Sequence, residues 1–193
     1  MGPGMPGMPG ILAPGQNRPG MGHHDPMNGD MSNGAMCDAR SEFDYLAHMI
    51  PHHAEAVAAA RNLARSERPE MRAFGARIVQ TQSAEIEQMR AWLREWYPNR
   101  PTDVAYHPMM RDLSGLSGDE LDRAFLDDMI PHHRHAVMMS QYLLRHGVAE
   151  HEQVAELART IRDTQTQEIA QMREWRRAWF SPRHPAPAVA RAR

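Results

Sequence analysis

Apolar side chains recur every three or four residues through most of the chain, the spacing that places them along one face of an α-helix. No stretch of comparable length alternates strictly between apolar and polar residues, as a half-buried strand would. Helix breakers interrupt the pattern at Pro69, at Gly147 and repeatedly between residues 98 and 116. The pattern therefore predicts four helices and an all-α fold, a four-helix bundle.

The helical region contains an internal duplication. The segment "YLAHMIPHHAEAV" at 45–57 matches "FLDDMIPHHRHAV" at 125–137, at an offset of 80 residues. The segment "TQSAEIEQMRAWLREWY" at 81–97 matches "TQTQEIAQMREWRRAWF" at 164–180, at an offset of 83. The three additional residues fall in a connecting turn, where extra length costs little. Each repeat is thus predicted to form one helix hairpin, and two hairpins to form the bundle.

Composition changes at both ends of the helical region. Residues 1–38 are rich in Met, Gly and Pro, and we expect a disordered tail there. The predicted bundle spans 39–182, and residues 183–193 form a second loose end. Within the bundle we expect repeat one at 41–97, a connection at 98–116 and repeat two at 117–181.

Two details concern how these elements begin and join. Ser117 precedes Glu120 by three residues, which is the pattern of a capping box, and Ser41 with Asp44 is a weaker version of it. The connection is long enough to cross an end of the bundle.

The second helix of each repeat carries an apolar stripe that is interrupted by the same two polar residues. Gln82 and Glu85 interrupt it in repeat one, and Gln165 and Glu168 interrupt it in repeat two. A buried amide without a partner costs about 1–3 kcal/mol, and an unpaired buried carboxylate costs more. Two such interruptions at equivalent places predict a partner at each.

The first helix of each repeat offers that partner. Met49 and His53 lie one turn apart, as do Met129 and His133, so the two side chains of each pair are directed at one spot. In an antiparallel hairpin, the Met and His of the first helix face the Gln, the Glu and the following Met of the second helix. Pro51 and Pro131 lack an N–H and are expected to kink the helix beside these side chains. His52 and His132 lie beside the stripe, about 100° round the helix.

These residue types indicate a soft metal ion. Thioether sulfur favours Cu(I), and imidazole serves copper in both oxidation states. The set has too few carboxylates for Mg²⁺ or Ca²⁺, lacks the Glu-x-x-His motif of di-iron bundles, and the single Cys37 argues against zinc. The alternative is that each His and Glu form a hydrogen bond with one another in a core that binds no metal.

The predicted metal ligands fall into two ranks. We expect direct ligands first among Met49, His53, Met129 and His133, and next among His52, His132, Met89 and Met172. We expect Gln82, Glu85, Gln165 and Glu168 to hold the imidazole N–H groups in place.

Other Met and His residues are weaker candidates. The tail carries several Met residues with His23 and His24, and auxiliary ligands could come from His107, Met109, Met110, His135, Met138 and Met139. The repeats differ here, because Glu55 stands where repeat two has His135. Two metal sites would therefore not be equivalent.

The motifs also resemble a known family. The segment "FLDDMIPHHRHAV", preceded by "LSGDELDRA" and followed by "TQTQEIAQMREW", is similar to the domain-of-unknown-function 305 family (DUF305) over about residues 40–182. The resemblance implies a ferritin-like four-helix bundle, often exported, with some members of the CopM copper-binding type. It implies Cu(I) or Cu(II), or silver, held by Met and His, the residues in question being Met49, His52, His53, Met89, Met129, His132, His133 and Met172.

Net charge and hydrophobicity indicate which partners and which cellular location to expect. The net charge of −2 gives no broad footprint for nucleic acid or anionic lipid. No apolar run approaches the roughly 20 residues of a membrane span. We also find no basic segment followed by an apolar segment, the pattern of a secretion signal. Family resemblance implies an extracytoplasmic or periplasmic protein, and a cytoplasmic location stays open.

The sequence thus predicts a soluble, non-enzymatic protein that sequesters or transfers copper, with a role in copper tolerance or homeostasis. A copper-transfer partner protein and the oligomeric state are left open. Two alternatives remain: a metal-dependent redox enzyme of ferritin-like fold, and a metal-free helical interaction module.

Overall fold

The computed structural model describes residues 40–181, which contain four long helices and no strand. The helices are α1 (Glu42–Arg61), α2 (Pro69–Trp96), α3 (Gly118–His146) and α4 (Glu152–Phe180), and a short 3-10 helix, η1 (Asn62–Arg65), follows α1. The predicted fold class, an all-α, ferritin-like four-helix bundle built from two helix hairpins, is confirmed. The expected tail at 1–38 and loose end at 183–193 lie outside the described residues.

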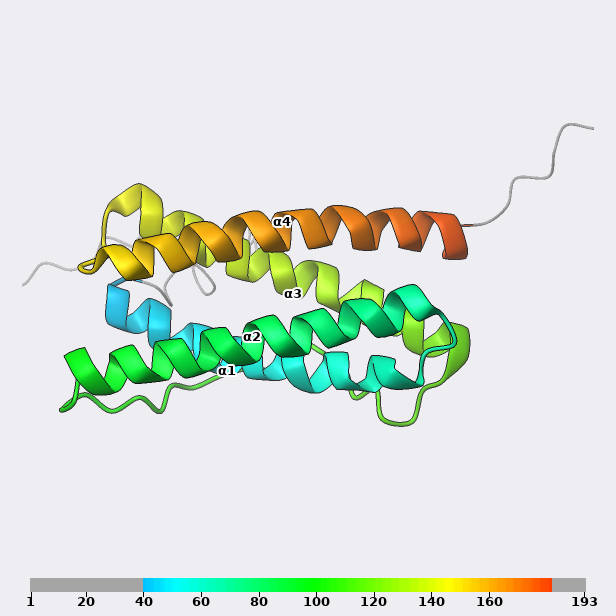
Figure 1. The fold of residues 1–193 in the computed structure, drawn as a ribbon, viewed down its shortest axis with the longest axis horizontal. Coiled ribbons are helices and arrows are strands. Elements are labelled where there is room, and N and C mark those ends of the chain that lie inside the picture. Colours follow the sequence, from blue (N-terminus) through cyan, green and yellow to red (C-terminus); the bar gives the residue numbers. More distant parts are fainter. Residues whose placement is uncertain (1–39, 182–193) are drawn as a thin grey trace, which may run out of the picture. The chain divides into compact units, whose positions relative to one another are not determined.

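Each repeat forms one hairpin, and the hairpins meet through their first helices (Figure 1). Helix α1 packs against α2, α3 packs against α4, and α1 also packs against α3. The start of α1 contacts the turn between α3 and α4, because Glu42 bonds to Glu150 and His151. Helices α1 and α3 are therefore antiparallel, which brings the middle of each beside the middle of the other.

The apolar stripes of the four helices form two buried clusters. One contains Phe74 of α2 and Phe125 and Met129 of α3. The other contains Met49 of α1 and Met89 of α2. Burying large apolar side chains contributes roughly 1.5–3 kcal/mol each, so the stripes that the sequence predicts supply the main driving force for this arrangement.

The capping prediction is confirmed at one helix and wrong at the other. The Ser41 hydroxyl accepts a hydrogen bond from the Asp44 backbone N–H at 3.1 Å and donates to the Asp44 carboxylate at 2.7 Å. Ser117 is the N-cap residue of α3, but its side chain makes no capping hydrogen bond. The next residue, Gly118, has a φ of +53°, so the first turn of α3 departs from ordinary helical geometry.

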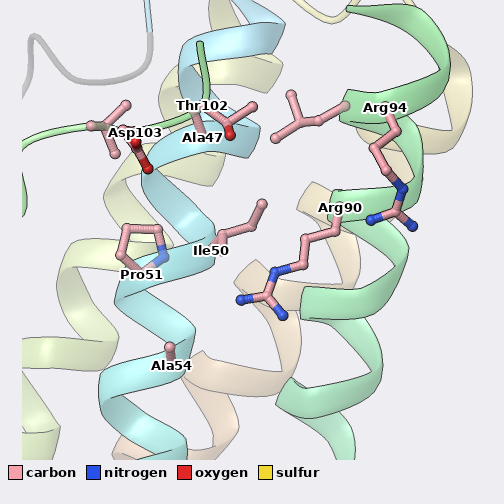
Figure 2. A pocket seen from close by; sticks show the side chains of 10 residues that line it. Ala47, Ile50, Pro51, Ala54, Arg90, Arg94, Thr102 and Asp103 are labelled. Carbon is pink, nitrogen blue, oxygen red and sulfur yellow. The ribbon is translucent and has the colours of Figure 1, made fainter. Parts of the chain in front are cut away.

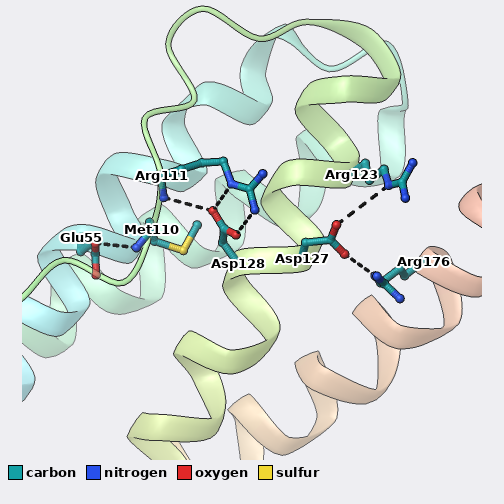
Figure 3. A network of polar contacts seen from close by, with 7 residues as sticks. All are labelled: Glu55, Met110, Arg111, Arg123, Asp127, Asp128 and Arg176. Carbon is teal, nitrogen blue, oxygen red and sulfur yellow. Dashed lines mark hydrogen bonds and ion pairs between the residues drawn. The ribbon is translucent and has the colours of Figure 1, made fainter.

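The connection between the hairpins runs along α1 rather than only across one end of the bundle (Figure 1). The Arg65 guanidinium donates to the carbonyls of Leu113, Ser114 and Leu116. Glu55 and Asp128 hold the middle of the connection through its backbone N–H groups, as Figure 3 shows for Met110 and Arg111. This route is required because α2 ends near the start of α1, whereas α3 begins near its end.

One end of the bundle is closed by a buried carboxylate from repeat one. Glu42, which has no exposed surface, accepts hydrogen bonds from the Tyr97 hydroxyl at 3.0 Å and from the backbone N–H groups of Glu150 and His151. It also contacts Nδ1 of His151 at 2.6 Å. The His151 ring stacks on Trp96 with 3.7 Å between centroids.

The other end is closed by the equivalent residues of the opposite repeats. Asp122, also without exposed surface, accepts a hydrogen bond from the Arg68 guanidinium at 2.8 Å. That guanidinium lies over the Trp179 ring, 4.7 Å from its centroid. At each end, a buried carboxylate from one repeat thus pairs with a residue at the helix turn of the other repeat.

We predict that Gly75→Ala destabilises the fold. A Cβ atom at Gly75 would lie 2.8 Å from the carbonyl oxygen of Ala60 and 2.8 Å from Cβ of Leu63, where α2 crosses the end of α1. Overpacking typically costs about 1–3 kcal/mol, and the better helix propensity of Ala returns about 1 kcal/mol of it. We expect a net loss of up to about 2 kcal/mol in urea unfolding. Gly115→Ala, which meets no atom within 4 Å, is the control and should change stability by less than about 0.5 kcal/mol in the unfavourable direction.

Candidate metal-binding site

The predicted ligands of both hairpins are buried at equivalent levels of the bundle. Helix α1 supplies Met49 and His53, and α3 supplies Met129 and His133; none of the four has exposed surface. Pro51 and Pro131 lie inside these helices, and each helix continues beyond its proline. The Met and His side chains of both hairpins are therefore buried in the core, as the apolar stripes predict.

Each buried histidine contacts the glutamate of its own hairpin. His53 Nε2 lies 2.9 Å from Glu85 Oε2, and His133 Nε2 lies 2.8 Å from Glu168 Oε2. The carboxylates are slightly exposed, at 12% and 16% of their side-chain surface, whereas the imidazoles are not exposed at all. The polar interruptions of the two stripes thus meet the imidazoles that the first helices present.

This contact fixes which ring nitrogen carries the proton in the neutral imidazole. An ionised carboxylate only accepts hydrogen bonds, so Nε2 must donate and Nδ1 then keeps its lone pair. Nδ1 of His53 and Nδ1 of His133 are both buried and have no hydrogen-bond partner among the described residues. Each hairpin therefore presents a buried nitrogen lone pair with no proton to accept.

The methionines of each hairpin share an apolar cluster. Met49 and Met89 belong to one cluster and Met129 and Met172 to the other, and all four are fully buried. Each hairpin thus buries two thioethers and the glutamate-paired imidazole of the predicted set. Whether these sulfur atoms bind a metal stays a prediction.

Gln82 and Gln165 are nearly buried, at 3% exposure each, and their Oε1 atoms have no partner among the described residues. A cavity of about 10 Å³ lies between α2 and α4 and is lined by both glutamines and by Glu85 and Glu168. That volume holds about one water molecule. The two carboxylates and the two amides thus border one small polar gap between the hairpins.

His52 and His132 are also buried, but they occupy a different place. Their rings stack on each other where α1 meets α3, with 3.7 Å between centroids and 27° between planes. Burial lowers the pKa of His52 well below its ordinary value, and the neighbouring His132 lowers it further. These two residues lie at the junction of the repeats rather than inside one hairpin.

Glu55 borders this junction and has a role that sequence analysis missed. Its carboxylate lies 3.2 Å from Nε2 of His132, accepts a hydrogen bond from the Tyr106 hydroxyl, and accepts the backbone N–H groups of Met109 and Met110 at 2.8 and 2.9 Å. Partial burial opposes its charge, yet the hydrogen bonds from His132, Tyr106 and Met110 outweigh that effect and lower the pKa of Glu55 to about 2. The only sequence signal was the exchange of Glu55 for His135 between repeats.

The weaker candidates are distributed over the surface and the junction. Met109 and Met138 are exposed at 39% and 43%, whereas Met139 is buried. The ring of His135 lies 5.3 Å from that of His52. The tail candidates His23 and His24 lie outside the described residues.

Imidazoles and carboxylates alone do not make a metal cluster here. Among residues 40–181, no three or more His, Cys, Asp or Glu side chains are grouped so as to hold an ion. A metal ion bound by residues 40–181 would therefore need thioether ligands as well, or would have fewer than three ligands of the His, Cys, Asp and Glu types. No helix in the same range is long and apolar enough to cross a membrane.

A larger hollow lies on the outer side of α1, at Pro51 (Figure 2). Its volume is about 570 Å³, and Ile50, Pro51, Arg90 and Arg94 are among the residues that line it. None of the predicted metal ligands lines this hollow. It therefore plays no part in the buried Met–His levels.

Fold and buried polar pairs together define a helical bundle with one imidazole–carboxylate pair in each of two hairpins. The chain belongs to the family described as "Domain of unknown function (DUF305)", whose model matches residues 42–176 and again residues 122–191. No curated protein shows significant similarity to the chain.

Several solved structures share this fold. CopM in its Cu(I)-bound form is 30% identical, covers 73% of this chain and 99% of its own, and superposes with a TM-score of 0.65. CopM co-crystallised with silver is 30% identical over 73% of this chain and 98% of its own, with a TM-score of 0.64. A candidate secreted DUF305 protein from Streptomyces coelicolor is 27% identical over 69% of this chain and 89% of its own, with a TM-score of 0.60.

We predict that the metal-free protein loses stability between pH 6.5 and pH 4 through His132. Burial is the largest cause that lowers the pKa of His132, which falls to about 4 against an ordinary 6.5 although Glu55 opposes the shift. The unfolded chain therefore binds the proton first as pH falls, and the loss levels off once the folded protein is also protonated. The loss from this residue is on the order of 3 kcal/mol.

Urea unfolding of the full chain in chelator, at pH steps from 7 to 4, measures this loss. The variant His132→Gln should show a shallower decline than the wild type over the same range. Parallel curves for the two proteins would assign the acid sensitivity to other groups.

Glu55 adds a separate loss of stability at lower pH. Because its pKa is depressed in the folded protein, the ionised carboxylate stabilises the fold above about pH 4.5, and that contribution disappears as pH falls toward 2.

Proposed function

We propose that the protein binds copper, most readily Cu(I) with Ag(I) as a mimic, at two positions that each lie within one hairpin. Met49, His53 and Met89 would hold the ion in repeat one, and Met129, His133 and Met172 would hold it in repeat two. The protein would sequester copper or transfer it to a partner, in copper tolerance or homeostasis. It would do so by binding rather than by catalysis.

The observation that carries the proposal is the unpartnered Nδ1 of His53 and of His133. Each ring is oriented from behind by a glutamate at its Nε2, which is the arrangement that raises the basicity of a metal-binding imidazole. A buried lone pair without a donor costs about 1–3 kcal/mol. A metal ion would remove that cost, since it accepts the lone pair without needing a proton.

The choice of copper follows from the thioethers. Methionine sulfur is a weak hydrogen-bond acceptor and a soft ligand, so a Met–His set selects Cu(I) and similar ions over Mg²⁺, Ca²⁺ or Mn²⁺. The CopM structures that contain copper or silver support the same choice. The polar gap between α2 and α4 would give the site an opening beside Glu85 and Glu168.

A metal-free interaction module is the second candidate, because a specific observation favours it. The His–Glu contacts are already formed within the chain at 2.8 and 2.9 Å, so the polar seam is partly closed without any ion. A ferritin-like redox enzyme is the third reading, and absorption bands of a bound metal together with O₂ consumption would support it. For location we propose an extracytoplasmic site, in keeping with the Streptomyces coelicolor relative.

We predict that His53→Ala/His133→Ala lowers the affinity for Cu(I) about a hundredfold or more. Cu(I) titration of the full chain against a competing chelator, with elemental analysis, measures affinity and stoichiometry. The matched control is His146→Ala, which removes one exposed histidine and should leave the affinity unchanged.

A second variant separates metal binding from packing. Met49→Leu/Met129→Leu keeps the volume of the core and should cost less than about 1.5 kcal/mol of stability per site, yet it removes one thioether from each position. We expect weaker Cu(I) binding at a nearly unchanged melting temperature. Unchanged affinity and stoichiometry in both double variants would contradict the proposed site, and a wild type whose melting temperature ignores Cu(I) and Ag(I) would favour the metal-free module.

A further inference from the structure

The junction between the repeats is built from equivalent positions of the two repeats, but these positions carry different side chains on its two sides. His52 and His132 occupy equivalent positions of the repeats and stack on each other. Positions 55 and 135, also equivalent, border the stack: Glu55 lies beside His132, and His135 lies beside His52. One side therefore presents a carboxylate to its imidazole, and the other presents a second imidazole.

The Glu55 side has a charged partner within the chain, although both ring nitrogens of His132 are buried without a well-aligned hydrogen bond. His132 Nε2 lies 3.2 Å from the Glu55 carboxylate, and the same carboxylate holds Tyr106 and the N–H groups of Met109 and Met110. Figure 3 shows Glu55 directed at the connection through Met110. A group so fully engaged by hydrogen-bond donors serves to anchor the connection.

The His135 side is not satisfied. His52 has 1% of its surface exposed, and neither of its ring nitrogens has a hydrogen-bond partner among the described residues. Nδ1 of His135 is likewise buried and without a partner. A buried nitrogen without a partner costs about 1–3 kcal/mol, so a ligand shared by His52 and His135 would relieve the fold of that cost.

We propose that His52 and His135 form a separate copper site that binds the ion through two imidazole nitrogens and no thioether. Imidazole serves copper in both oxidation states, so this site would take Cu(II), which the Met–His levels disfavour. The inference rests on the proposed function for the identity of the metal. It adds a site between the repeats, on α1 and α3, that the two hairpin positions do not use.

The spacing of the rings supports this pair over its neighbours. Imidazole nitrogens bind metal ions at about 2.0–2.1 Å, which places the centroids of two rings that share an ion about 5–6 Å apart. The His52 and His135 centroids are 5.3 Å apart, whereas the stacked His52 and His132 rings, at 3.7 Å, are too close. The His52–His53 pair is 6.1 Å apart, but adjacent helical residues diverge by about 100°.

The site also has a route to solvent. His135 is partly exposed, and Met138 lies one turn further along α3 with 43% of its surface exposed. Side chains three residues apart share a helix face. An ion arriving at the Met138 thioether would therefore reach His135 before the buried His52.

Electron paramagnetic resonance of the full chain with one equivalent of Cu(II) tests the site. Every protein carries His23→Gln/His24→Gln/His184→Gln, so that the three imidazoles outside the described residues do not contribute. The parent should show coupling to two imidazole nitrogens. His135→Gln should lose one of them and weaken Cu(II) binding about tenfold or more, whereas His146→Gln, an exposed residue of the same helix, should change neither.

A second variant guards against a fold that simply fails. His135→Glu gives position 135 the residue that repeat one carries at position 55, so the bundle should keep its melting temperature while one nitrogen coupling disappears. A parent with fewer than two imidazole couplings, or a spectrum and affinity unchanged by both substitutions, would overturn the proposal. Ag(I) titration of the same variants reports the thioether positions, so loss of the Cu(II) site and failure of the proposed function give different results.

Discussion

The arrangement of each hairpin depends on a buried imidazole that needs a partner across the helix pair. An unpaired polar group in the core costs about 1–3 kcal/mol, and a shift of one helix by a single residue would turn the glutamate away from the histidine by about 100°. The contacts of His53 with Glu85 and of His133 with Glu168 therefore fix the register of α1 on α2 and of α3 on α4. The apolar stripes supply the driving force, and these two pairs select one alignment among those that the stripes would tolerate.

The same constraint explains what could be predicted from the sequence. The helices, the two hairpins, the burial of His53 and its contact with Glu85 follow from periodicity and from the cost of a polar residue in an apolar stripe. Each of these needs only the positions along one helix or within one hairpin. The Ser117 cap was wrong, because the backbone of Gly118 decides the geometry of that turn and no periodicity reveals a positive φ.

The junction of the repeats lay beyond the reach of pattern analysis. The stack of His52 on His132 depends on how two helices from different hairpins cross, and the stripe that places His53 says nothing about that crossing. Glu55 and Tyr106 come together because the connection runs along α1, a route that its length alone does not determine. Comparison of the repeats showed that Glu55 stands where repeat two has His135, but it did not show what either residue contacts.

The closures at the two ends of the bundle make the two hairpins depend on each other. The carboxylate of Glu42 pairs with the turn that holds His151, and that of Asp122 pairs with the turn that holds Arg68. Each hairpin thus buries an acid whose counterpart lies in the other hairpin. One hairpin alone would leave that acid without its counterpart, so neither half of the chain is a self-sufficient folding unit.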